Sequence, residues 1–214
     1  MPDSRNQDAL EQGQEAEIAI LFADLRGFTG FSEHKLPYDV VYILNQYFEL
    51  MGHAIESQGG RVDKFIGDGI MALFGLQDGI EKGCLHGLRA IRGMQDMLIE
   101  LNKRVKHDLN EPLDMGIALH CGQVIVGRMG YGEATGLTAI GDAVNTASRM
   151  ESATREYNCR VIISEDVATK AGIAPEMEEA FPAHTMSVRG RAQPLKIYTI
   201  ENPSRLPIPG QPIA

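Results

Sequence analysis

The order of apolar segments limits the fold of this chain more than any other feature of its sequence. Apolar side chains recur at helical spacing in two long segments, and short β-rich runs surround them. The predicted order is strand 17–24, helix 37–58, strands 61–66 and 70–74, helix 79–106, and a strand pair at 115–119 and 123–126. Strand, helix, two strands, helix and strand is the order of a ferredoxin-like βαββαβ unit. We therefore expect an α+β fold with a ferredoxin-like core.

Additional C-terminal strands and helices are expected after this core. A turn about Cys121-Gly122 separates the strand pair, and the Gly-rich segment 128–137 is a projection without a core pattern of its own. The later elements are a helix at 143–157, a strand at 160–164, a short helix at 165–171, and a final hairpin of 184–188 with 195–200.

A single domain is expected over residues 17–200. A chain of 214 residues can bury one core, and no internal repeat or linker interrupts this range. Residues 1–16 are rich in Gln, Glu, Asp and Asn, so we expect a flexible N-terminal lead. Residues 201–214 contain four prolines and are predicted to form a Pro-rich C-terminal tail.

Composition excludes several classes of partner. A net charge of −9 opposes binding to nucleic acid or an anionic membrane, which requires clustered Lys and Arg. No apolar run approaches the roughly 18 residues of a spanning helix, and the polar N-terminus is unlike a signal peptide. We therefore expect a cytoplasmic chain without membrane insertion.

The three cysteines are widely spaced and odd in number, which indicates reduced thiols. For His120, beside Cys121, a structural role is favoured over metal binding.

Two aspartates occupy positions that favour a metal site. Asp24 ends an apolar strand before a glycine-containing loop, and Asp68 stands at the tip of a predicted hairpin. Two such carboxylates can share a pair of divalent cations, and hard oxygen ligands suit Mg²⁺ or Mn²⁺. Either aspartate alone is more commonly a local cap or turn residue. Their joint occurrence favours metal binding.

A third motif supplies groups suited to phosphoryl transfer. Asn145 and Arg149 are four residues apart in a predicted helix, hence on one face. The amide can hold a sugar, and the guanidinium can stabilise charge on a reacting phosphate. The alternative is a capping Asn followed by a surface Arg.

Three motifs in this order resemble the signature of the class III nucleotidyl cyclases, the catalytic domains of adenylyl and guanylyl cyclases. The motifs are residues 22–29, 64–69 and 138–149, and the resemblance extends from Glu17 to Ile200. It implies an adenylate cyclase that converts ATP to 3′,5′-cyclic AMP and pyrophosphate. It also implies two divalent cations, Mg²⁺ or Mn²⁺, as cofactors.

The resemblance implies a role for single residues along the bound ATP. The metal ligands are Asp24, Asp68 and the Leu25 carbonyl, and the phosphate loop is Gly27, Phe28 and Thr29. Asn145 holds the ribose and Arg149 neutralises charge in the transition state. Arg189 contacts the triphosphate, with Arg191 as its competitor for that role.

Lys64 and Thr138 match the purine-reading pair of this family. By resemblance, Lys64 donates to adenine N1 and the Thr138 hydroxyl accepts from the exocyclic amine. Guanylyl cyclases typically place Glu where Lys64 stands, so ATP is favoured over GTP. Thr at the second position marks a subgroup that includes bicarbonate-responsive members. How strictly the site rejects GTP stays open, because a hydroxyl can donate or accept.

The resemblance also implies a homodimer. In the family, the metal aspartates of one chain face the purine pair, Asn and Arg of another. This chain carries both halves, so a symmetric dimer with two sites follows, and residues 128–137 resemble the arm that joins the subunits. Alternatives are a guanylate cyclase and a nucleotide-binding regulatory module without turnover. A sensor or regulatory domain upstream of Met1 is compatible with this sequence, which does not name the activating signal.

Overall fold

In the described part of the chain, the first six elements follow the predicted βαββαβ order. The computed structural model describes residues 13–28, 35–107, 109, 111–188 and 193–209. These elements are β1 (Gln14–Leu25), α3 (Pro37–Glu56), β2 (Arg61–Ile66), β3 (Gly69–Phe74), α4 (Ile80–Arg104) and β4 (Met115–Met129).

Smaller elements follow β4. They are the 3₁₀ turn η1 (Gly132–Ala134), β5 (Gly136–Ile140), α5 (Asp142–Glu156), β6 (Val161–Ser164), α6 (Glu165–Lys170), α7 (Ala174–Ala180), β7 (Ala183–Met186), β8 (Leu195–Ile200) and the 3₁₀ turn η2 (Pro203–Arg205). β5 and α7 were not among the elements predicted from the sequence. None of the helices in the described ranges has the length and hydropathy needed to cross a membrane.

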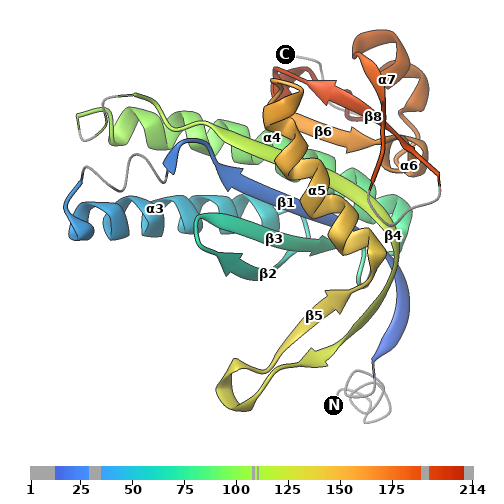
Figure 1. Cartoon of the computed structure of the whole chain (residues 1–214), viewed down its shortest axis with the longest axis horizontal. Coiled ribbons are helices and arrows are strands. Elements are labelled where there is room, and N and C mark those ends of the chain that lie inside the picture. Colours follow the sequence, from blue (N-terminus) through green and yellow to red (C-terminus); the bar gives the residue numbers. More distant parts are fainter. Residues whose placement is uncertain (1–12, 29–34, 108, 110, 189–192, 210–214) are drawn as a thin grey trace.

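One mixed sheet runs through the molecule in the order β2-β3-β1-β4-β6-β8-β7, and β5 pairs with β4. β1 is antiparallel to both β3 and β4, whereas β4 and β6 are parallel. The order β2-β3-β1-β4 is that of a ferredoxin-like fold, so the predicted fold class is confirmed. The β4–β5 hairpin projects away from the body of the molecule (Figure 1).

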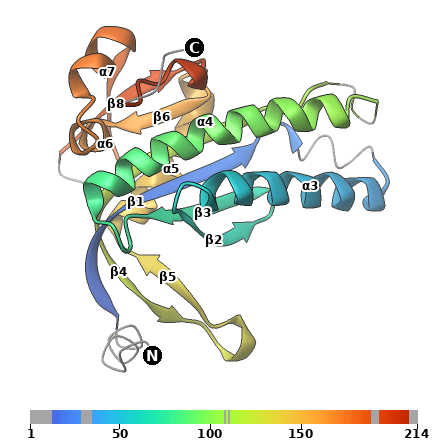
Figure 2. The same cartoon turned by 180° about the vertical axis from the view of Figure 1, so that it is seen from behind.

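The two faces of the sheet carry separate hydrophobic clusters. α3 and α4 cover one face and α5 covers the other (Figures 1 and 2). Residues of β1 alternate between them: Ala19 and Leu21 join the α3/α4 cluster, while Ile18 and Ile20 join the α5 cluster. Because both faces are buried, β1 reads in the sequence as a continuous apolar run.

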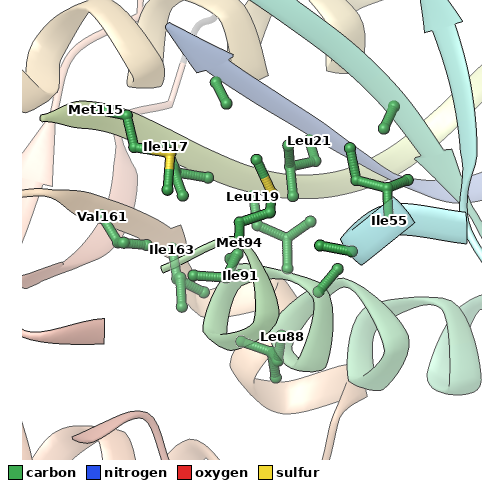
Figure 3. Close-up of a cluster of buried hydrophobic side chains, with 14 of the residues drawn as sticks. Leu21, Ile55, Leu88, Ile91, Met94, Met115, Ile117, Leu119, Val161 and Ile163 are labelled. Atoms are coloured by element: carbon green, nitrogen blue, oxygen red, sulfur yellow. The ribbon is translucent and has the colours of Figure 1, made fainter. Parts of the chain in front are cut away.

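Packing of α4 against the centre of the sheet forms the middle of the larger cluster. Figure 3 shows Ile91 and Met94 of α4 among Ile117 and Leu119 of β4, and none of the four is more than 1 % exposed. Full burial of such a side chain contributes about 1.5–3 kcal/mol. This packing fixes the strands whose ends carry the candidate site.

The predicted turn at Cys121-Gly122 is wrong. β4 is one strand of 15 residues, and its ladder with β1 runs unbroken through both residues. The glycine favours a turn locally, but pairing along a 12-residue partner strand overrides that preference. His120 is consequently buried in the sheet, with Nδ1 2.9 Å from Ser164 Oγ, which agrees with a structural role.

The two ends of the described domain also differ from expectation. β1 begins at Gln14, before the predicted start of the domain at residue 17. Leu206 and Ile208 are buried in the α3/α4 cluster, so the interpretation of residues 201–214 as a tail is wrong for this part. The four prolines predicted a tail, but the apolar residues on either side of Pro207 pack into the core. Residues 1–12 and 210–214 lie outside the described residues.

Candidate active site

Two adjacent strand ends bring Asp24 and Asp68 together. Asp24 is the penultimate residue of β1, and Asp68 lies in the turn between β2 and β3, where Gly67 takes a φ of +63°. β3 pairs with β1 directly beside this turn. Asp24 Oδ1 lies 3.5 Å from the point that a Cβ on Gly69 would occupy. The two aspartates predicted as metal ligands are therefore neighbours.

Helix α5 adds two charged side chains to this pair. Gly116 of β4 lies opposite Asp24, and a Cβ there would be 2.5 Å from Thr154 Oγ1 and 2.9 Å from Glu151 Oε1. The absence of a side chain lets the helix approach the strand closely. Arg155 Nη2 donates to Asp24 Oδ2 at 2.6 Å. Glu151 and Arg155 were not predicted as site residues, although their spacing of four residues places both on one helix face.

Burial and negative charge raise several pKa values in this cluster. Burial, followed by the charge of Asp24, raises the pKa of Glu151 to about 7. The same two causes raise the pKa of Asp68. The Tyr47 hydroxyl, which has no partner among the described residues, has its pKa raised by burial and then by Asp24. The charge of Asp24 thus disfavours ionisation of Glu151 and Asp68, and a bound cation would relieve this unfavourable interaction.

The oxygen ligands of this site fit a hard divalent cation. Asp24 and Asp68 supply carboxylates, and the Leu25 carbonyl follows at the same strand end, which suits Mg²⁺ or Mn²⁺. Within the described ranges, no group of three or more His, Cys, Asp and Glu side chains could hold a metal by itself. The remaining oxygens would have to come from a ligand such as the phosphates of a nucleotide.

Asp63 joins the two residues predicted to read the purine. Thr138 Oγ1 on β5 donates to Asp63 Oδ2 at 2.9 Å, and Lys64 Nζ lies 3.2 Å from the same oxygen. The Asp63 side chain is fully buried, whereas that of Lys64 is 47 % exposed. The structure thus brings Lys64 and Thr138 together through an aspartate that was not predicted as a site residue. Its position next to Lys64 was its only signal in the sequence.

Asn145 and Arg149 lie on an exposed face of α5. Their positions, 10 and 6 residues before Arg155, place them about 15 Å and about 9 Å from it along the helix axis. They are also rotated from it by about 80° and about 120° around the helix. Since Arg155 is the residue that contacts Asp24, the face that carries Asn145 and Arg149 is not the one that α5 presents to this carboxylate.

The predicted phosphate loop is described only in part. Phe28 is buried, and apart from the neighbours of Gly27 in the chain, no heavy atom of the described residues lies within 4 Å of the point that a Cβ on Gly27 would occupy. This open space leaves room for a ligand beside the backbone. Thr29, Arg189 and Arg191 lie outside the described residues.

Comparison with known proteins gives consistent matches. The family described as "Adenylate and Guanylate cyclase catalytic domain" matches residues 10–202. An adenylate cyclase of Anabaena cylindrica is 34 % identical over 185 residues, which is 86 % of this chain and 36 % of the relative. The solved structure of the guanylyl cyclase Cya2 has 34 % identity and a TM-score of 0.76, and the match covers 88 % of this chain and 93 % of that one. For the adenylyl cyclase CyaB from P. aeruginosa, the identity is 26 %, the TM-score 0.75 and the coverage 89 % and 96 %.

These matches leave the nucleotide base undecided. The curated relatives are much longer than this chain, which spans 36 %, 8 % and 27 % of three of them. The similar structures include both an adenylyl and a guanylyl cyclase. The residues around the purine site must therefore distinguish the two bases.

Proposed function

Because the chain belongs to the adenylate and guanylate cyclase catalytic domain family, we propose that it is an adenylate cyclase that converts ATP to 3′,5′-cyclic AMP and pyrophosphate. The proposal depends most on the pairing of Asp24 with Asp68, whose pKa is raised by burial and by Asp24. A regulatory module without turnover would not need two carboxylates held together at this energetic cost.

Asp24, Asp68 and the Leu25 carbonyl would hold two divalent cations, Mg²⁺ or Mn²⁺. When bound, such cations lower the pKa of the ribose 3′-hydroxyl and neutralise charge on the phosphates. The 3′-oxygen attacks the α-phosphorus of the same ATP, and pyrophosphate leaves from the opposite side. Because Arg155 Nη2 donates to Asp24 Oδ2, Asp24 would have to give up this ion pair in order to hold a cation. The backbone at Gly27, beside which the described residues leave space, would let the leaving phosphates approach closely.

Asn145 and Arg149 would act on the nucleotide of a second subunit. Asn145 orients the ribose, and Arg149 stabilises charge on the reacting phosphate, where loss of one positioned donor commonly reduces the rate by about 10²–10³. Both side chains are exposed and lie on a different helix face from Arg155. A symmetric homodimer with two complete sites would bring them to the partner's aspartates.

Exposed apolar side chains support such a dimer. Large exposed hydrophobic residues occur on β2 and on the β4–β5 arm, namely Phe65, Ile66, Tyr131 and Ile140. Exposed apolar side chains that a partner chain could cover are suited to subunit contacts. Tyr131 lies in segment 128–137, which resembles the arm that joins the subunits.

The base site favours ATP. Lys64 is a donor and suits adenine N1, which is an acceptor, whereas guanine carries a hydrogen on N1. The similarity to the guanylyl cyclase Cya2 makes GTP the competing substrate. Both nucleotides should therefore be compared in the same assay.

Turnover of ATP by the purified chain tests the proposal. With ATP and Mn²⁺ we expect cyclic AMP and equimolar pyrophosphate, with a slower reaction from GTP. Asp78→Asn, which changes an exposed acidic residue outside the site, is the matched control for Asp24→Asn and Asp68→Asn and should keep wild-type turnover. Nucleotide binding without cyclic product at saturating Mn²⁺ would instead support a regulatory module, and faster use of GTP would support a guanylate cyclase.

A further inference from the structure

Asp63 is a buried carboxylate that both proposed base-reading residues share. Its side chain is 0 % exposed, although Lys64 beside it is half exposed. Oδ2 accepts from Thr138 Oγ1 at 2.9 Å and lies 3.2 Å from Lys64 Nζ. Oδ1 is buried and has no hydrogen-bond partner among the described residues. A buried carboxylate with an unsatisfied oxygen destabilises the fold, so stability does not explain why an aspartate occupies this position.

The contact with Asp63 determines how the Thr138 hydroxyl can be used. A threonine hydroxyl has one hydrogen to donate and two lone pairs that can accept. An ionised carboxylate can only accept, so in the contact of 2.9 Å the hydrogen belongs to Thr138 and points to Asp63. The hydroxyl then has only lone pairs left for a ligand.

Lys64 can bind Asp63 and still donate a hydrogen bond to a ligand. An ammonium group has three N–H donors and no acceptor. One donor can stay on Asp63 Oδ2 while another reaches a base. Asp63 therefore fixes one acceptor and one donor, on β5 and β2 respectively.

We propose that Asp63 is a positioning residue for purine selection, which holds Thr138 as an acceptor and Lys64 as a donor. This inference rests on the proposed cyclase function. Adenine presents an amine donor at position 6 and an acceptor at N1, which match this pair. Guanine presents an acceptor at position 6 and a donor at N1, which oppose both members. Without Asp63, the Thr138 hydroxyl can rotate and donate to the guanine oxygen.

Asp63→Ala tests the inference through the ratio of kcat/KM for ATP to that for GTP. We expect the ratio to fall by about tenfold, the change that one mispaired polar group typically causes. Asp63→Asn keeps an oxygen that can accept from Thr138, so it should retain most of the preference. Asp63→Leu, close in shape to Asp, replaces Asp63→Ala if the smaller side chain impairs folding.

A double-mutant cycle separates this role from a general structural one. Thr138→Val removes the hydroxyl while keeping its shape. In that background Asp63→Ala should change the ATP to GTP ratio by less than about twofold, because there is no hydroxyl left to orient. Inhibition by 3′-deoxy-ATP and 3′-deoxy-GTP, which bind but cannot cyclise, should report the same change in preference.

The outcomes are distinct. An unchanged ratio in folded Asp63→Ala or Asp63→Leu protein overturns the inference, as does an equal fall with and without Thr138. Wild-type protein that forms no cyclic nucleotide from either substrate contradicts the proposed function itself. A fall in the ratio that depends on the Thr138 hydroxyl supports the role of Asp63.

Discussion

Replacing Glu151 by Gln should make the metal-free protein more stable at alkaline pH. Glu151 is only 7 % exposed, and its side chain extends from α5 toward Gly116, the residue of β4 that lies opposite Asp24. Burial first, and then the charge of Asp24, raises its pKa from 4.5 to about 7, despite the opposing charges of Arg155 and Arg26. The carboxylate is thus poorly tolerated in the folded state, and an amide removes the charge while nearly keeping the shape.

The magnitude follows from these two pKa values. Between pH 4.5 and about 7, the folded state keeps the Glu151 proton while the unfolded state releases it. Stability therefore falls as the pH rises through this window, by about 1.4 kcal/mol per pH unit, or about 3 kcal/mol in all. Above about pH 7 the loss is complete. Glu151→Gln lacks this dependence, so its advantage over wild type should grow by about 2–3 kcal/mol between about pH 5 and pH 8.

Urea unfolding at several pH values in the presence of EDTA measures this difference. Any pH-independent effect of the amide cancels in the comparison, because only the change in the difference with pH matters. Glu156→Gln, an exposed position on the same helix, is the matched control and should follow wild type. Parallel stability curves for wild type and Glu151→Gln would refute the assignment of a raised pKa to this carboxyl group.

Three further predictions concern catalysis. Asp24→Asn and Asp68→Asn should each abolish turnover and also remove the stabilisation of the protein by Mn²⁺ in thermal unfolding, and substantial activity in either at saturating Mn²⁺ would exclude the two-metal assignment. Lys64→Glu combined with Thr138→Cys should depress use of ATP far more than use of GTP, which a comparison of kcat/KM measures; an unmoved ratio would mean that neither residue reads the base. Asp68→Ala and Arg149→Ala chains should each be nearly inactive, yet subunit exchange between equal amounts should restore about a quarter of wild-type activity, since about half of the dimers are mixed and carry one intact site. Exchanged chains that remain inactive would place the site within one subunit.

The fold was largely predictable because its signals are local and periodic. The helices α3 and α4 carry long amphipathic patterns, and Gly67-Asp68-Gly69 marks the turn between β2 and β3. The turn wrongly placed at Gly122 shows the limit of such signals. Whether a glycine in a β-rich run ends a strand depends on its partner, and β1 was long enough to keep β4 extended.

Some of the predicted site residues are neighbours within one chain, and others are not. Asp24 and Asp68 are neighbours, as the strand and hairpin positions suggested. Glu151 and Asp63 were missed because their importance comes from burial and from contacts with distant strands, which no sequence spacing records. Asp63 meets Thr138 across 75 positions of the chain, and only the sheet brings them together.

The arm formed by β4 and β5 is expected to be the least cooperative part of the sheet. The ladder between β1 and β4 ends at Gln14 and Val126, and beyond it the pairs from Gly127–Thr138 to Met129–Gly136 involve β4 and β5 alone among the described strands. A two-stranded ribbon is only marginally stable by itself. Its amide hydrogens should therefore exchange with solvent through local opening, while those at the centre of β4 exchange only when the whole domain unfolds. Hydrogen exchange in the arm would then report directly on whatever packs against it.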